Sequence, residues 1–152
     1  MAGPPPHALG AGALHGLDIQ VLCPLKRGPD GYRALNDEIE RRWMVHQPRV
    51  GQMGVSLGSK LLWLKNDYSK APFRDAEGDP VLDAATGEPV CAGFMNGALG
   101  VVRRRTERGA WVEFDDGAAD EIRLPDLVNL TRGWAISVHK AQGSAFRKVV
   151  VP

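Results

Sequence analysis

"GWAISVHKAQGSAF", residues 133–146, is the segment that decides the fold, and it lies close to the last residue of the chain. Gly143 is a typical helix stop, and the run KVVVP at 148–152 predicts a buried strand. The pattern therefore predicts a short helix followed by a strand. Apolar side chains recur at the spacing of one helix face at Trp134, Ala135, Val138 and Ala141.

The N-terminal part of the chain repeats this pattern. LDIQVLCP, residues 17–24, is a β-branched run closed by proline and predicts a strand buried on both faces. After a glycine-containing loop, residues 31–45 predict a helix. Strand, loop and helix make half of a βαβ unit, so both ends of the chain are expected to belong to one α/β layer. The apolar face of this helix consists of Tyr32, Leu35, Ile39 and Trp43.

The middle of the chain predicts a small antiparallel barrel. Short strand candidates are separated by Gly, Asn and Asp turns, and WVEFDDGAADEIRL (111–124) is a hairpin pattern that reverses near Asp116 and Gly117. Residues 74–92 are polar and rich in turns, which fits either an additional β-hairpin, the favoured interpretation, or a mobile loop.

Composition narrows the function classes. Hydrophobic residues make up 43% of the 152 residues and charged residues 24%, as in soluble globular proteins. The net charge of +1 means that any surface for a polyanion must be a local patch. Cys23 and Cys91 are expected to be reduced thiols in a cytoplasmic protein, and the four histidines lack zinc-ligand spacing. No apolar run approaches the roughly 20 residues that span a bilayer.

A complete active site is not expected. The sequence contains no GxxxxGK[ST] phosphate loop, acidic Walker B run, GxSxG elbow, HExxH or paired carboxylates. Ser137 and His139 are two positions apart on a predicted helix and therefore face different directions, which argues against a nucleophile–base pair. Lys140, Ser144 and the N–H groups around Gly143 could hold a phosphate, although an isolated His–Lys pair is more often a solvated face.

Four segments, in order, resemble RecD-type superfamily 1 DNA helicases (exodeoxyribonuclease V alpha subunit and relatives). AISVHKAQGSAFRKVVVP (135–152) is similar to that family's motif V, close to AITVHKSQGSEFDKVVLP, and residues 18–40 resemble the region around its motif IV. GSKLLWLKNDYSK (58–70) and FMNGALGVV (94–102) resemble the SH3-like barrel inserted in the second RecA-like domain. The resemblance covers about residues 17–152.

The resemblance implies α/β plus all-β architecture, a partial RecA-like domain with an inserted small SH3-like antiparallel barrel. The chain would then be a piece of a helicase that stops after motif V. The expected division is 1–16, a disordered leader or cloning boundary; 17–50, the first part of the second RecA-like domain; 51–130, the barrel; and 131–152, the return to the RecA-like domain.

The resemblance also implies functional residues. The single-strand contacts would be Ser137, His139 and Lys140, and the nucleotide-side residues would be Gln142, Gly143, Ser144, Lys26 and Arg27. ATP and Mg²⁺ are expected only in the full-length parent, with single-stranded DNA and the parent's N-terminal RecA-like domain as partners. No membrane partner is expected, and self-association through exposed strand edges is possible.

Two features modify this expectation. The family often has glutamate where this chain has Ala145, and alanine cannot accept a ribose hydrogen bond, a loss of about 0.5–1.5 kcal/mol. On the barrel, Trp63 with Lys65 and Tyr68 are candidate single-strand contacts. So are Arg103 and Arg105, which strand alternation places on one face with Arg104 opposite. The competing interpretation places Trp63 in the core and pairs the arginines with acidic residues of the neighbouring hairpin, Asp115, Asp116, Asp120 and Glu121.

Two other functions stay open at this point. The chain could be an SH3-like module that binds a protein partner, with helicase-like remnants at its sides. It could also be the helicase part of a conjugative relaxase or of a phage protein, because the VHKAQG pattern occurs there too.

The chain alone is predicted to hydrolyse no ATP. Phosphoryl transfer requires a Walker A lysine and an acidic residue that holds magnesium, and neither is present in the sequence. The family's catalytic arginine would follow VVVP, beyond residue 152. A steady-state ATPase assay with single-stranded DNA should give background rates, and turnover well above background would contradict the prediction.

Overall fold

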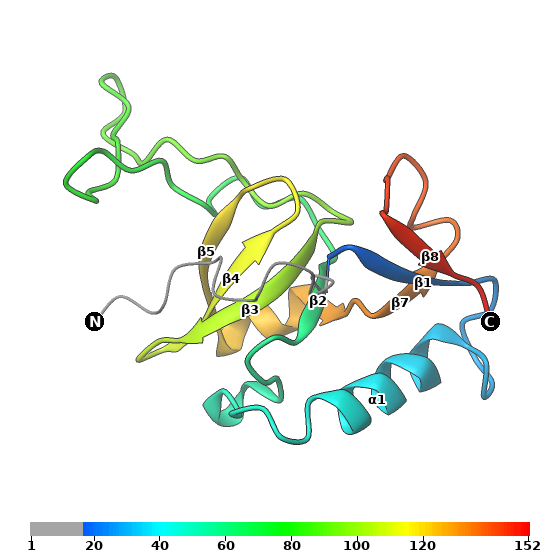
Figure 1. Cartoon of the computed structure of the whole chain (residues 1–152). Coiled ribbons are helices and arrows are strands. Elements are labelled where there is room, and N and C mark those ends of the chain that lie inside the picture. The colour runs from blue at the N-terminus through cyan, green and yellow to red at the C-terminus, as the bar shows by residue number, and fades with distance from the viewer. Residues whose placement is uncertain (1–16) are drawn as a thin grey trace.

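The computed structural model describes residues 17–152 and contains two sheets (Figure 1). One is a three-stranded parallel sheet in the order β7-β1-β8, and the other is a five-stranded antiparallel sheet in the order β5-β4-β3-β2-β6. The helix α1 lies beside the parallel sheet, and residues 73–90 project from the antiparallel sheet on the opposite side of the molecule. The leader predicted for residues 1–16 lies outside the described residues.

The parallel sheet joins the two ends of the chain, as the sequence predicts. Its strands are β1 (Ile19–Cys23), β7 (Ala135–Ser137) and β8 (Lys148–Val150). Val21 of the central strand lies opposite Ala135 on one side and Val150 on the other. Residues more than a hundred positions apart in sequence therefore form one layer.

The predicted helix over residues 134–141 is wrong. Ala135–Ser137 is a strand, and turns follow it. The helical spacing of the apolar residues is overridden because the segment completes a backbone ladder with β1 and buries Ile136 to 3% exposure. One helix-like turn remains, in which the amide of Ala141 donates to the carbonyl of Ser137.

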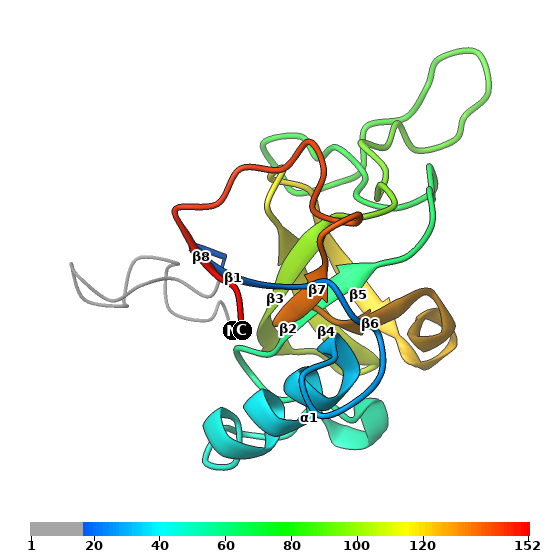
Figure 2. The ribbon, with the colours of Figure 1, turned by 90° about the vertical axis from the view of Figure 1, so that its right-hand side faces the viewer.

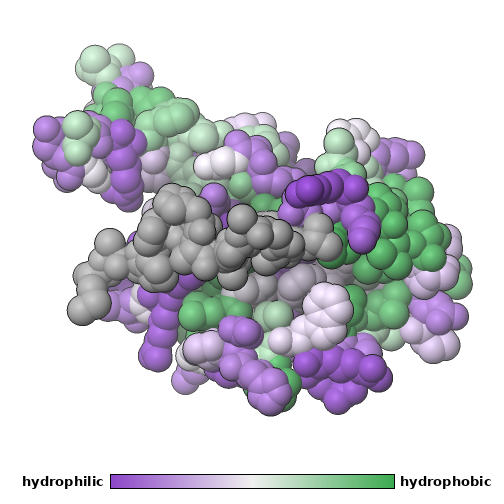
Figure 3. Space-filling view, in the orientation of Figure 1, coloured by the Kyte–Doolittle hydropathy of each residue, from purple (hydrophilic) through white to green (hydrophobic). Residues whose placement is uncertain are grey.

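The strand predicted at 148–152 exists but is not buried. In β8, Val149 and Val150 are 46% and 45% exposed, because β8 is an edge strand and no described element covers its outer side. Figure 3 shows hydrophobic surface over this edge. β1 is also less buried than predicted: Gln20 and Cys23 are buried, and the other three residues are half-buried.

The predicted N-terminal helix is confirmed as α1 (Tyr32–Trp43), but the side chains that it buries are not those of the predicted apolar face. The buried positions are Asn36 and Glu40, whereas Trp43 is 63% exposed. Polar residues are buried here because α1 packs on the backbone and indole of the segment that enters β7, and these groups require hydrogen-bond partners.

The predicted β-rich middle is confirmed as a curled antiparallel sheet (Figure 2). Gly117, with φ of +87°, makes the predicted reversal between the fourth and fifth strands. The sheet encloses an aromatic core in which Phe94 lies 4.4 Å from Phe114 and 5.1 Å from Trp63, centroid to centroid. The strands are β2 (Lys60–Trp63), β3 (Leu99–Arg105), β4 (Gly109–Phe114), β5 (Ala119–Arg123) and β6 (Leu130–Arg132), with the 3-10 helices η1 (Gly51–Met53) and η2 (Leu124–Asn129) at its margins.

The projecting segment, residues 73–90, contains two successive tight hairpins. Phe73 donates to the carbonyl of Val90, Val90 donates to that of Val81, and Val81 donates to that of Phe73, so three short extended stretches lie side by side. The favoured hairpin interpretation is therefore correct in kind, but there are two reversals, not one.

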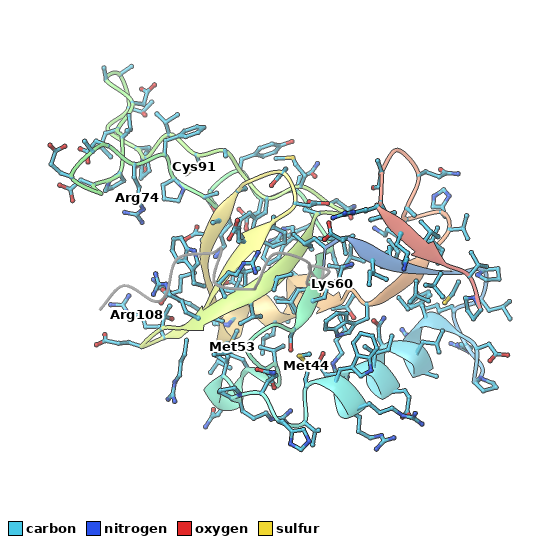
Figure 4. The ribbon with its side chains drawn as sticks, in the orientation of Figure 1. Met44, Met53, Lys60, Arg74, Cys91 and Arg108 are labelled. Atoms are coloured by element: carbon cyan, nitrogen blue, oxygen red, sulfur yellow. The ribbon has the colours of Figure 1, made fainter. Side chains whose placement is uncertain are left out.

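Lys60 connects the two sheets. Its side chain is fully buried between them, and its Nζ donates to the carbonyl oxygen of Ile19 in β1 over 2.8 Å (Figure 4). Burial lowers the pKa of Lys60 to about 8, although the charges of Asp115 and Asp18 act in the opposite direction. Holding the ammonium group between the sheets therefore costs free energy at neutral pH.

Stability should consequently rise with pH above about 8. Between that pH and the ordinary lysine pKa of about 10.4, the unfolded chain keeps a proton that the folded chain has lost, so the free energy of unfolding increases by about 3 kcal/mol. Urea unfolding across this range should show the increase in the wild type and in Lys65→Met, an exposed control. It should be absent in Lys60→Met, and parallel pH profiles for all three proteins would contradict the assignment.

Candidate nucleic-acid interface

Two loops leave the same edge of the parallel sheet. Cys23, the last residue of β1, lies opposite Ser137, the last residue of β7, so the loop 24–31 and the turn 138–144 both follow carboxyl ends of strands. The amide of Val138 donates to the carbonyl of Cys23, which ties the start of the turn to this edge. Open α/β sheets bind ligands at such edges.

The turn 138–144 is anchored at its centre and open at its tip. Ala141 is buried, and its amide donates to the carbonyls of Ser137 and Val138, both at 3.2 Å. The Ser137 hydroxyl accepts a hydrogen bond from the amide of Lys140 at 3.1 Å, so it shapes the turn. Gly143 has φ of +81°, and a Cβ added there would meet no atom within 4 Å.

Lys140 reaches from this turn to the antiparallel sheet. Its Nζ donates to the side-chain Oδ1 of Asn96 over 2.8 Å, and the backbone amide of Asn96 donates to the side-chain Oδ1 of Asn66 over 2.9 Å. His139 and Lys140 are exposed, as are the two asparagines. The exposed surface formed by these four residues, named the bridging face below, thus combines the turn after β7 with the connection between β2 and β3.

The chain behind the turn is held by buried hydrogen bonds. Asn36 of α1 donates to the carbonyl of Ala135 over 2.7 Å and accepts from the amide of the same residue over 2.8 Å. The indole of Trp134 donates to Glu40 over 2.8 Å, and Glu40 also accepts from the Ser59 hydroxyl. These contacts fix the point from which β7 and the turn extend.

Lys26 and Arg27 are exposed on the loop 24–31, at the same sheet edge as the turn. Lys26, however, lines a cavity of about 700 Å³ together with residues of α1 and β6. The loop with Lys26 and Arg27 and the turn with Gln142 and Ser144 therefore lie at one edge of the parallel sheet. Lys26 also lines the cavity beside α1 and β6.

The structure does not support the single-strand contacts predicted on the antiparallel sheet as they were expected. Trp63 is fully buried against Phe94, so its prediction as a stacking platform is wrong: β2 is an inner strand whose side chains fill the core. Arg103 forms an ion pair with Glu113 of β4 at 3.1 Å, an acidic neighbour other than the four that the competing interpretation names. A bulge between Val102 and Arg104 breaks the strand alternation, so Arg103 and Arg105 do not form the simple common face that was predicted.

The tip of the turn has suitable chemistry for a nucleotide. Gln142 and Ser144 are exposed beside the open space at Gly143, and their amide and hydroxyl groups can bind phosphate or ribose oxygens. Among residues 17–152 there is no group of three or more His, Cys, Asp or Glu that could hold a metal ion.

Asn96 and Asn66 are the residues of the bridging face that sequence reasoning missed. Both belong to polar turn motifs, "NG" and "KND", and such motifs ordinarily report only a chain reversal. Their partnership with Lys140 depends on how the two sheets meet, which local sequence does not encode.

Comparison with known proteins gives two curated relatives over nearly the whole described region. The ATP-dependent RecD2 DNA helicase of Deinococcus radiodurans is 28% identical over 134 residues, 87% of this chain and 16% of the relative. The RecBCD enzyme subunit RecD of Buchnera aphidicola is 25% identical over 132 residues, 86% of this chain and 19% of the relative. The chain is similar in sequence to these two RecD-type helicases. It spans less than a fifth of the length of these relatives.

No family model matches the chain. Among solved structures, Bacteroides Pif1 bound to single-stranded DNA is similar over 88% of this chain and 34% of its own, with a TM-score of 0.48 and 17% identity. Bacteroides Pif1 with ADP-AlF3 and single-stranded DNA gives a TM-score of 0.48 and 15% identity over 94% and 36%. At these values the likeness supports no argument about function. None of the helices in residues 17–152 has the length and apolar character to cross a membrane.

Removing the Asn36 side chain should destabilise the fold around β7. Asn36→Ala leaves the buried amide and carbonyl of Ala135 without their partner, which should lower the free energy of unfolding by about 1–3 kcal/mol. Urea denaturation measures the change, and Arg33→Ala, on the exposed side of the same helix, is the control. Equal unfolding free energies for Asn36→Ala and the wild type would show that the contact does not hold β7.

Proposed function

We propose that this chain is the part of an ATP-dependent DNA helicase or translocase that contacts single-stranded DNA and couples this contact to the nucleotide site. In this proposal residues 17–50 and 131–152 belong to the second RecA-like domain, and residues 51–130 form an inserted SH3-like barrel. The observation that carries the proposal is the hydrogen bond between Lys140 and Asn96 on the bridging face.

Each residue of the bridging face has a chemical role in the proposal. Lys140 supplies a positive charge for a phosphate, and Asn96 holds that charge at a fixed place above the antiparallel sheet. His139, exposed beside it, can donate to a phosphate or stack on a base. The backbone of residues 137–141 sets the spacing between these groups, because Ala141 and Ser137 are hydrogen-bonded to one another.

DNA binding and nucleotide binding would be coupled because the residues that contact single-stranded DNA and those at the nucleotide-side tip of the turn are close in sequence. Gln142 and Ser144 follow Lys140 within four positions, on a turn whose other end is tied to β1 and α1. Hydrolysis of bound ATP would supply the energy with which the two RecA-like domains of the parent open and close. Ala145 provides no side-chain acceptor, so Gln142 and Ser144 would carry the nucleotide contacts of this turn.

Substitutions on the bridging face should weaken single-strand binding. Lys140→Ala and His139→Ala should each reduce affinity for a fluorescent oligo(dT) several-fold. Lys140→Ala should also reduce the dependence of log K on log salt by about 0.7, the value for one lost phosphate contact on a single strand. Fluorescence anisotropy measures both quantities.

The matched control is Lys148→Ala, another exposed lysine on the parallel sheet. Unchanged affinity in Lys140→Ala and His139→Ala, or the absence of single-strand binding by the wild type, would refute the proposal. Either result would favour a protein-interaction module.

A further inference from the structure

A second basic surface lies at the far end of the antiparallel sheet. A cavity of about 1190 Å³ opens between the β3–β4 turn, the outer side of β4 and β5, and the base of the projecting segment. Figure 4 shows Arg74, from the projecting segment, and Arg108, from the β3–β4 turn, on facing sides of this space and remote from β7 and β8. We call it the outer groove; the cations that line it are Lys70, Arg74, Arg104, Arg105, Arg108 and Arg123.

The acidic side chains of the outer groove are largely engaged. Asp126 pairs with Lys70 at 3.0 Å, and Glu121 pairs with Arg123 at 2.8 Å. Asp120 accepts hydrogen bonds from the amides of Ala71 and Glu121. Glu107 is the remaining lining carboxylate, and it lies exposed in the β3–β4 turn.

Several arginines of the groove lack a close carboxylate partner, although the charge of Arg108 contributes to lowering the pKa of Glu121. Within residues 17–152, Arg104, Arg105 and Arg108 form no ion pair, and Arg74 donates to a carbonyl, that of Gly78, at 2.8 Å. The Gly78 carbonyl orients the Arg74 side chain at the side of the groove formed by the projecting segment, but it does not neutralise the guanidinium charge. Two walls of the groove therefore present excess positive charge toward one another.

We propose that the outer groove binds the sugar–phosphate backbone of double-stranded DNA. Arginine forks suit phosphate oxygens, and excess charge on two walls of an open groove suits a continuous polyanion. Because the groove lies away from the bridging face, this is a second DNA contact, and it does not depend on the proposed single-strand site.

The aromatic content of the groove favours a duplex over a single strand. Proteins that hold single strands usually offer free aromatic faces on which bases stack. Trp111 is the aromatic residue of the groove, and the guanidinium of Arg104 lies over its ring, 5.0 Å from the centroid. A duplex keeps its bases stacked inside and presents phosphates, which require cations and no free aromatic face.

The test compares duplex and single-strand affinity in variants with matched loss of charge. The groove variant is Arg105→Gln/Arg108→Gln, which keeps the Arg104–Trp111 stack, and Arg74→Gln tests the opposite wall. The control is Arg33→Gln/Arg41→Gln on the exposed side of α1. Anisotropy of a labelled blunt duplex of about 20 base pairs, and of one of its strands, gives both affinities at several salt concentrations.

The groove variant should bind the duplex at least tenfold more weakly, with a salt slope reduced by about 1.8 for two lost phosphate contacts. Arg74→Gln should show a loss in the same direction and about half the change in slope. Single-strand affinity should change less than threefold in both, and the control should match the wild type for both ligands. Circular dichroism and urea unfolding verify that each variant is folded.

Four results would overturn the proposal. One is an equal loss of duplex binding in the groove variant and in the control. Another is an equal loss of duplex and single-strand binding in the groove variant. The third is competition of the duplex by poly-glutamate at the same charge concentration, which would indicate an acidic protein as the ligand. The fourth is unchanged duplex binding in the groove variant, which, beside a loss of single-strand binding in Lys140→Ala, would leave only the single-strand proposal.

Discussion

The structure depends on one buried contact, the pair of hydrogen bonds between the Asn36 amide and the backbone of Ala135. These residues lie 99 positions apart, and the contact joins α1 to the strand that precedes the turn 138–144. Glu40 extends it to the Trp134 indole and to Ser59, at the entry to the antiparallel sheet. One helix face therefore holds the parallel sheet and the antiparallel sheet together, and the turn 138–144 leaves from this junction.

Sequence patterns predicted most of the elements and failed where tertiary pairing decides. The strand at 19–23, the helix at 32–43 and the Asp116–Gly117 hairpin follow from local spacing and turn chemistry, and all are present. Where a helix is predicted at 134–141, residues 135–137 form a strand and turns follow, because the parallel ladder with β1 outweighs helical periodicity in a segment this short. Likewise, the polar residues buried on α1 could not be identified from an apolar stripe, because their partners are distant backbone and indole groups.

In the candidate site, too, some residues could be identified from local sequence and others depend on tertiary contacts. His139 and Lys140 could be selected from the motif alone, and both are exposed on the turn. Asn96 could not, because its hydrogen bond with Lys140 arises from the meeting of two sheets. Trp63 was misassigned because an aromatic residue in a basic segment resembles a stacking platform in sequence, whereas its position on an inner strand places it in the core.

The central claim is that the bridging face, built from the turn after β7 and the connection between β2 and β3, receives single-stranded DNA. Its most direct test is the titration of ¹⁵N-labelled protein with a short oligo(dT), followed by chemical shifts of the backbone amides and the Asn side-chain amides. The account predicts shift changes in residues 137–144 together with Asn96 and Asn66, and little change along the exposed edge strand β8. Changes confined to one of these two segments, or spread evenly over the surface, would contradict it.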